Sequence, residues 1–420
     1  MRTITSLILI AVLLTSVVSP LYVQAQTSKE YSITGAGATF PFPLIDLWRV
    51  KYGEIHPNIS LNYQSIGSGG GVKQHIENTV NFGASDAPLT LNEVQLAPDS
   101  LTIPEAIGGI TVTYNIPEVP KSGLKLTGTQ VADIFLGKIT RWNDPSIKAN
   151  NPTLNLPNKE IVTAHRSDGS GTTHVFTEYL FIVSPEWDEK VGFGKSVPWP
   201  TGLGAAGNEG VAGIVRSTPY SVGYVELAYV FQNKMTYASI QNGDKTAFVE
   251  PSLQTLSAAA AGAAAKLPAA HESWSGVTIN NAPGKDSYPI TSFTYLLVHE
   301  KLEKAVKDKA QAKEVVNLIK WMITDGQKHS PELLYVPIPP EVTELGLEGL
   351  ARITYNGEKL YDGPTTYSGD GLLSTQAKQA KKIPDWVRNI FKFYGDGQIG
   401  DDDLINGIQF LIKEGIIKLQ

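Results

Sequence analysis

The chain has 420 residues, of which 42% are hydrophobic and 18% charged, the balance of a globular protein with room for two or three domains. Its formal net charge of −6 and the absence of a Lys/Arg cluster argue against nucleic acid as a partner. Because the sequence has no cysteine, disulfides, thiol chemistry and a cysteine-linked lipid are excluded.

The first 25 residues have the layout of a secretory signal peptide. Arg2 precedes an apolar run at 7–18, and residues 23–25 form a small-residue cleavage site. An uncleaved anchor helix is the alternative, although the run is short for a membrane span. We therefore expect residues 1–25 to be removed and the protein to be secreted, on the extracytoplasmic side of the cell membrane.

The mature chain begins with strands that run into Gly-rich turns. This pattern occurs at 31–40 and 60–71, each time followed by a helical spacing of apolar residues, and a further short strand ends at 82–88. Such alternation predicts an α/β sheet, in which ligands bind at the carboxyl ends of the strands. Both turns, and Asp86, would lie at such ends.

The turn at 166–172 is the most informative stretch of the sequence. It follows a β-branched run at 161–164 and precedes apolar residues with helical spacing at 175–183. A strand is therefore predicted to enter a Gly/Ser turn that opens a helix. Such a helix start offers unpaired backbone N–H groups and a positive dipole end to an anion.

The side chains of this turn suit the same chemistry. Ser170 and Thr172 add hydroxyl donors, and Arg166 adds a planar cation that matches a tetrahedral oxyanion. Asp168, two residues after Arg166, can hold the guanidinium in place. An ordinary turn with a helix cap is the alternative that this stretch leaves open by itself.

The rest of the chain suggests a second lobe and a separate C-terminal part. Strands at 110–115 and 289–298 are expected to cross between two lobes, with an Ala-rich surface helix at 252–270 and a long helix from about 302 to 324. Residues 362–383 are polar and without periodicity, which is typical of a flexible linker. Residues 384–420 regain a helical pattern and are expected to form a small helical hairpin.

The common catalytic and nucleotide-binding motifs fit poorly. Gly35-x-Gly37 lacks the third glycine of a dinucleotide fingerprint, and Gly67 to Lys73 lacks the glycine that precedes the lysine of a P-loop. The seven histidines show no metal-ligand spacing, and the turn around Asp396 lacks the first ligands of a calcium loop. We therefore expect no enzyme activity, no metal and no cofactor.

Four motifs together carry a family resemblance. They are Gly35 to Pro41, Gly67 to Gln74, Phe82 to Pro88, and Arg166 to Thr172. In this order and spacing they resemble the extracytoplasmic phosphate-binding proteins of ABC-type phosphate importers, over about residues 31–361. The resemblance implies a type 2 periplasmic-binding-protein fold of two α/β lobes with two chain crossovers, in which 26–361 bind phosphate. Lobe I would comprise about 26–115 and 291–361, and lobe II about 116–290.

The resemblance also implies the ligand contacts and partners. The family's phosphate contacts fall on Thr39, Phe40, Ser68, Asp86, Arg166, Ser170, Gly171 and Thr172, supported by Asp168. Among these donors Asp86 is an acceptor, suited to the proton that phosphate carries and sulfate lacks. The expected partners are inorganic phosphate and a membrane permease, for a protein that acts as a monomer. A receptor for sulfate or molybdate, or a phosphate-ester hydrolase, is the alternative.

Overall fold

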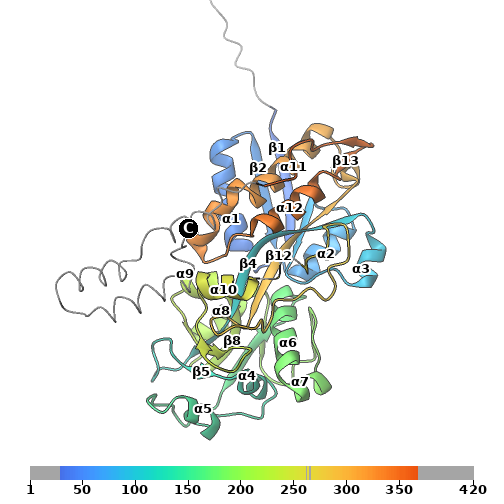
Figure 1. Cartoon of the computed structure of the whole chain (residues 1–420). Helices are drawn as coiled ribbons and strands as arrows, with labels where there is room; N and C mark the ends of the chain where they lie inside the picture. The colour runs from blue at the N-terminus through green and yellow to red at the C-terminus, as the bar shows by residue number, and fades with distance from the viewer. Residues whose placement is uncertain (1–28, 262, 264–265, 368–420) are drawn as a thin grey trace, which may run out of the picture.

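The computed structural model describes residues 29–261, 263 and 266–367, which form two α/β lobes (Figure 1). Within these residues the main sheet has nine strands in the order β2-β1-β3-β12-β4-β8-β6-β7, with β9 beside β4. The predicted signal peptide and helical hairpin lie outside the described residues, as does most of the predicted linker. No helix in the described part of the chain is long and apolar enough to cross a membrane.

The first lobe joins the beginning and the end of the described chain. Its strands are β1 (Tyr31–Gly37), β2 (Ile59–Ser65), β3 (Phe82–Ser85) and β12 (Thr291–His299). Its helices are α1 (Phe42–Ile55), α2 (Ser68–Ile76), α3 (Leu91–Leu96), η2 (Leu302–Lys304), α11 (Lys309–Ile323), η3 (Asp325–Leu333) and α12 (Pro340–Leu350), followed by the hairpin of β13 (Thr354–Tyr355) and β14 (Glu358–Lys359). Because β1 pairs in parallel with both β2 and β3, the three strand ends meet at one edge.

The second lobe is built from the middle of the chain. Its strands are β5 (Lys125–Leu126), β6 (Val162–Arg166), β7 (Leu203–Ala205), β8 (Ser221–Glu226), β9 (Thr236–Tyr237), β10 (Ser239–Gln241) and β11 (Phe248–Val249). Its helices are α4 (Gly128–Phe135), α5 (Pro145–Asn150), α6 (Gly171–Val183), α7 (Pro185–Lys190), α8 (Gly207–Ser217), α9 (Leu227–Gln232) and α10 (Leu253–Ala260). Strand β6 lies between β7 and β8, parallel to both. Its last residue, Arg166, faces the first lobe, because it bonds to Thr39 there.

Strand β4 (Ser100–Asn115) connects the two lobes. Residues 100–104 and 106–109 pair with β12 in the first lobe, with a register shift at Glu105, and Ile110–Asn115 pair with β8 in the second. Every residue of β4 except the two at its ends is buried. The crossover predicted at 110–115 is thus the second half of a longer strand, and the chain returns to the first lobe through β12. The predicted two-lobed type 2 fold is confirmed.

Two predicted helices were too long. The Ala-rich helix at 252–270 is only α10, Leu253–Ala260, whose first turn is closed by a capping box between Ser252 and Thr255. The helix predicted from about 302 to 324 is divided into η2 and α11 (Lys309–Ile323). Asp308 starts α11, because its carboxylate accepts the backbone N–H of Ala310 at 2.9 Å.

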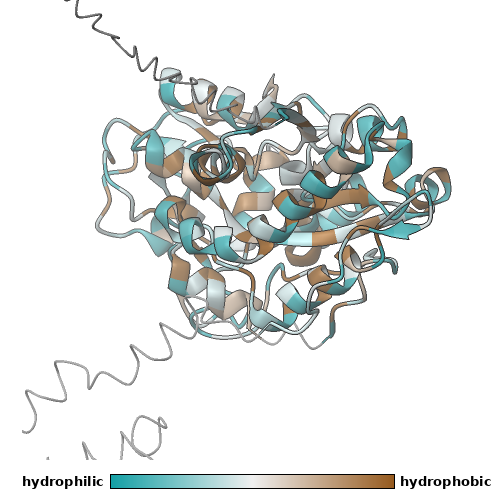
Figure 2. Cartoon of the chain, turned by 90° about the horizontal axis from the view of Figure 1, so that it is seen from above, coloured by the Kyte–Doolittle hydropathy of each residue, from teal (hydrophilic) through white to brown (hydrophobic). Residues whose placement is uncertain are grey.

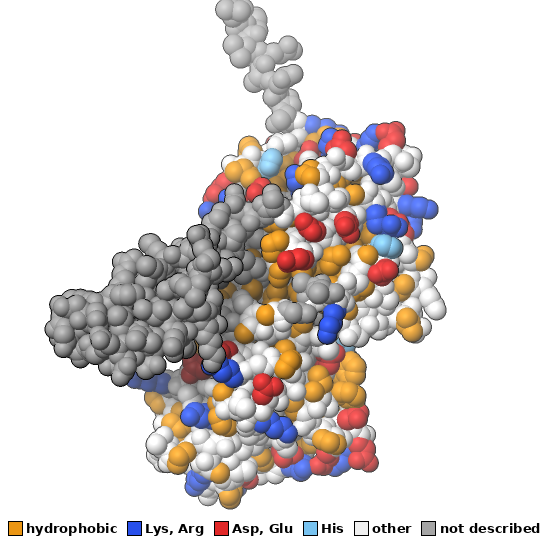
Figure 3. Space-filling model, viewed as in Figure 1, with side chains coloured by type: hydrophobic (Ala, Val, Ile, Leu, Met, Phe, Trp, Pro, Cys, Tyr) orange, Lys and Arg blue, Asp and Glu red, His pale blue; other side chains and the backbone are white. Residues whose placement is uncertain are grey.

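The hydrophobic core extends through both lobes. Figure 2 shows hydrophobic strands in the interior, with hydrophilic residues mostly on the outer helices and loops. Buried Trp48 and Tyr295 belong to the first lobe, and Trp142 and Trp187 to the second. On the face drawn in Figure 3, acidic and basic side chains are interspersed over both lobes. An anion site must therefore depend on local donors, as the net charge of −6 also indicates.

Candidate functional site

The eight residues predicted to contact the ligand lie at strand ends and helix starts. Thr39 and Phe40 connect β1 to α1, Ser68 begins α2, Asp86 follows β3, Arg166 ends β6, and Ser170, Gly171 and Thr172 open α6. All are buried, and the most exposed of those with a side chain, Arg166, has an exposed fraction of 3%. The structure thus brings all eight to the boundary between the lobes.

The two lobes are in direct contact at this boundary. Arg166 Nη1 of the second lobe donates to Thr39 Oγ1 of the first at 3.1 Å. The backbone N–H of Gly171 donates to Ser68 Oγ at 3.0 Å, and that of Gly69 donates to the carbonyl oxygen of Gly169 at 2.9 Å. These hydrogen bonds require the lobes to be closed, so the structure represents a closed conformation.

Glycine permits this close approach. Gly67, which precedes α2, has φ of +84°, and a Cβ there would lie 2.4 Å from Asp168 Oδ2. A Cβ at Gly171 would lie 2.5 Å from both Asp86 Oδ2 and Ser68 Oγ. A side chain at either position would therefore keep the lobes apart.

Asp168 holds the guanidinium of Arg166. Arg166 Nε donates to Asp168 Oδ1 at 2.7 Å and Nη2 to Oδ2 at 2.5 Å, in a bidentate pair. Burial alone would raise the pKa of Asp168, but the hydrogen bonds and charge of Arg166 hold it below its ordinary value. The pair leaves Arg166 Nη1 directed toward Thr39 and, at 3.4 Å, toward Thr172 Oγ1.

Asp86 is a buried acceptor among these donors. Its Oδ1 accepts from Thr294 Oγ1 at 3.0 Å, its Oδ2 accepts from Ser68 Oγ at 3.4 Å, and the backbone N–H of Thr172 also bonds to the carboxylate. Burial raises the pKa of Asp86 to about 7, although these bonds and the charge of Arg166 oppose the rise. Burial and the charge of Asp86 raise the pKa of nearby Glu105 to about 8.

Three further residues of the site were not found from the sequence. Thr294 on β12 bonds to Asp86. Tyr229 on α9 donates its hydroxyl across the lobes to the carbonyl oxygen of Thr39 at 2.6 Å. Asn208, at the start of α8, donates to the hydroxyls of Thr39 and Thr172 at 2.8 and 3.0 Å. Of the three, only Asn208 had a signal in the sequence. It follows a short Gly-containing strand and lies in the first turn of a helix, in the same kind of strand-to-helix turn as the predicted site residues.

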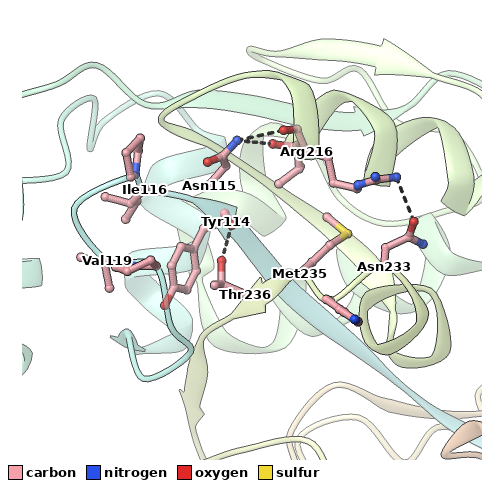
Figure 4. Close-up of a pocket in the computed structure, with 12 residues that line it drawn as sticks. Tyr114, Asn115, Ile116, Val119, Arg216, Asn233, Met235 and Thr236 are labelled. Carbon is pink, nitrogen blue, oxygen red and sulfur yellow. Dashed lines mark hydrogen bonds between the residues drawn. The ribbon is translucent and has the colours of Figure 1, made fainter.

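A pocket at the far end of β4 has a different character. Figure 4 shows Arg216 bonded to Asn233 Oδ1, at 2.9 Å, and Asn115 bonded to backbone carbonyl oxygens of α8. Ile116, Val119 and Met235 supply apolar walls. Because these labelled polar groups are bonded to one another, they do not converge on a common point as the donors between the lobes do.

Comparison with known proteins identifies the family. A PBP superfamily domain matches residues 23–325. The chain is 45% identical to the phosphate-binding protein PstS of Xylella fastidiosa over 325 residues, which are 76% of this chain and 85% of the relative. It is 46% identical to PstS of Pasteurella multocida over 320 residues, covering 76% and 90% of the two chains. The chain belongs to the PstS family. The resemblance inferred from the four motifs is therefore confirmed.

Solved structures agree with the PstS fold. A phosphate ABC transporter substrate-binding protein of Clostridium perfringens, solved with bound phosphate, has 17% sequence identity and a TM-score of 0.53. The match covers 73% of this chain and 100% of the other. At this identity the likeness supports the two-lobed fold and carries no argument about individual residues.

Proposed function

We propose that this chain captures inorganic phosphate between its two lobes and delivers it to the membrane permease of an ABC importer. One observation carries the proposal: donors from both lobes converge beside the buried carboxyl group of Asp86. The PstS relatives, which are named phosphate-binding proteins, support it. The protein acts as a secreted monomer that binds its ligand without a cofactor.

The arrangement of donors and acceptor suits phosphate better than sulfate or molybdate. Helices α2 and α6 begin at the site, where their backbone N–H groups and positive dipole ends favour an anion. Arg166 adds a cation, and Thr39, Ser68, Ser170 and Thr172 add hydroxyls. Ionised Asp86 accepts the proton of phosphate, whereas sulfate has no proton to donate and would be repelled.

A hydrolase is disfavoured by the bonding of the site hydroxyls. Ser68 Oγ bonds to Asp86 and to backbone N–H groups, and Ser170 Oγ accepts the backbone N–H of Thr173 as a helix cap. In the described part of the chain no imidazole bonds to either hydroxyl, so neither belongs to the serine–histidine pair that activates the nucleophile of a serine hydrolase. Binding and release of phosphate is the function that these contacts support.

Calorimetric titration of the mature protein tests the proposal. We expect one phosphate per chain and no measurable heat with sulfate at the same concentration. A protein that binds sulfate as tightly as phosphate would support the alternative oxyanion receptor. Steady release of phosphate from a generic phosphate ester, at a rate that scales with protein concentration, would support the hydrolase.

A further inference from the structure

Asn208 is the most highly connected polar side chain of the site outside the predicted set. It is the second residue of α8 and has an exposed fraction of 0%. Its Oδ1 accepts the backbone N–H of Glu226 at 3.0 Å, which determines the orientation of the amide. The amide nitrogen therefore faces Thr39 Oγ1 at 2.8 Å and Thr172 Oγ1 at 3.0 Å.

The hydroxyl of Thr39 is surrounded by donors. Its oxygen accepts from Asn208 Nδ2, from the backbone N–H of Asn208 at 3.2 Å, and from Arg166 Nη1 at 3.1 Å. A hydroxyl has two lone pairs and one proton, so three N–H donors use all of its capacity to accept. Its own proton must then point away from Asn208 and Arg166.

Thr172 is held in the same way, by donors of its own lobe. Its hydroxyl oxygen accepts from Asn208 Nδ2 at 3.0 Å and from Arg166 Nη1 at 3.4 Å. Two donors match its two lone pairs. The Asn208 amide and Arg166 Nη1, which each donate to both hydroxyls, thus leave these hydroxyls available only as donors.

We propose that Asn208 is a positioning residue for phosphate, because it orients the hydroxyl protons of Thr39 and Thr172 toward the bound anion. The proposal rests on the proposed function, since it needs an anion between the lobes. Without the amide, Thr172 would keep one donor, Arg166 Nη1, for two lone pairs, so its hydroxyl could rotate and present a lone pair to the anion. Thr39 would lose the shortest of its three donor contacts and keep the two longer ones. Because Thr39 and Asn208 lie on different lobes, the arrangement forms only on closure and strengthens binding in the closed conformation.

Two substitutions separate this role from simple packing. Asn208→Ala removes the amide, and we expect phosphate affinity to fall about tenfold, the scale of one or two hydrogen bonds. Asn208→Asp keeps the shape but cannot donate when ionised, so both hydroxyls would turn toward it. We expect a loss of about a hundredfold or more. A packing role predicts the opposite order, because Asp fills the space and Ala leaves a cavity; that order would overturn the proposal.

A double-mutant cycle tests whether Asn208 acts through the two hydroxyls or by a direct electrostatic effect on the anion. We expect Asn208→Ala to cost about twofold or less in protein that already carries both Thr39→Val and Thr172→Val. If the protein with both valines binds phosphate too weakly to titrate, Thr172→Val alone is used as the background. The loss of affinity caused by Asn208→Ala should then be smaller than it is in wild type. An undiminished cost would show that Asn208 acts by another route and would overturn the proposal.

Controls distinguish failure of this proposal from failure of the proposed function. Asn151→Ala removes another buried amide of the second lobe, bonded to backbone atoms of Lys125 and Ile147, and should leave phosphate affinity unchanged. Thermal unfolding identifies variants that do not fold, and Asn208→Ser then replaces Asn208→Ala. If wild type does not bind phosphate, the proposed function is wrong. If wild type binds and the Asn208 variants bind equally well, only the positioning role is wrong.

Discussion

Asp86→Asn should stabilise the phosphate-free protein in mildly alkaline solution. Burial raises the pKa of Asp86 from its ordinary 3.8 to about 7, so the folded chain holds this proton more tightly than the unfolded chain does. The resulting stability is complete below the unfolded pKa and is lost as the pH rises through about 7. A pKa that differs by about three units between the folded and the unfolded chain corresponds to about 4 kcal/mol of stability lost when Asp86 ionises. Asparagine does not ionise, so the variant does not lose this stability.

Denaturant unfolding of phosphate-free protein at about pH 5 and about pH 8 measures the effect. We expect wild type to lose stability between the two values and Asp86→Asn to lose less. At the higher pH the variant should be more stable by at most about 4 kcal/mol, since opening of the lobes can hydrate the wild-type carboxylate. Burial also raises the pKa of Glu105, and this cause is present in both proteins, so some pH dependence should remain even though the variant lacks the charge of Asp86.

Asp168→Asn is the matched control for this experiment. The pKa of Asp168 is lowered, against the effect of burial, by its bonds to Arg166. Its stabilising contribution is therefore present above the unfolded pKa, and its loss should destabilise the protein at about pH 8. The prediction is wrong if Asp86→Asn is no more stable than wild type at about pH 8, or if its stability falls as steeply with pH. Either result would show that ionising the buried Asp86 does not destabilise the folded protein.

The same variant measures selectivity. A site built around one hydrogen bond can reject an analogue that lacks it by roughly 10⁴–10⁵. Asparagine can donate or accept, so Asp86→Asn should lose rejection of sulfate more than it loses affinity for phosphate. Competition by sulfate in both proteins is the measurement. Equal rejection by both would assign the selectivity to another residue.

Three further predictions concern the site and the chain end. Arg166→Ala should weaken phosphate binding by about 3–5 kcal/mol. Arg166→Lys should also weaken it, because an ammonium lacks the bidentate fork, but by less, because the positive charge remains. Phosphate affinity of Arg166→Ala within a few-fold of wild type would contradict the assigned site. Gly69→Ala should weaken binding without lowering the melting temperature, since its Cβ would lie 3.1 Å from Gly169 Cα in the closed protein. A chain shortened after Tyr367 should keep both its phosphate affinity and its thermal unfolding, and loss of binding would place the C-terminal segment in the binding domain.

The local parts of the site could be predicted from the amino-acid sequence. Strand, turn and helix follow one another within a few residues at Thr39, Ser68 and Arg166, so periodicity and Gly-rich turns are enough to locate them. The pair of Arg166 and Asp168 was also visible, because the two residues are separated by one position. The four motifs together indicated the family, and with it the two-lobed fold.

The way in which these parts meet follows from the packing of the two lobes. Asn208 and Tyr229 bond to Thr39 across 169 and 190 positions of the chain, and Thr294 bonds to Asp86 across 208. Such contacts leave no periodic pattern in the sequence, because each depends on how the lobes close. The raised pKa of Asp86 likewise follows from burial between the lobes. The local sequence therefore determines which groups can bind an anion, and lobe closure determines which hydroxyls donate and how much an ionised carboxylate costs.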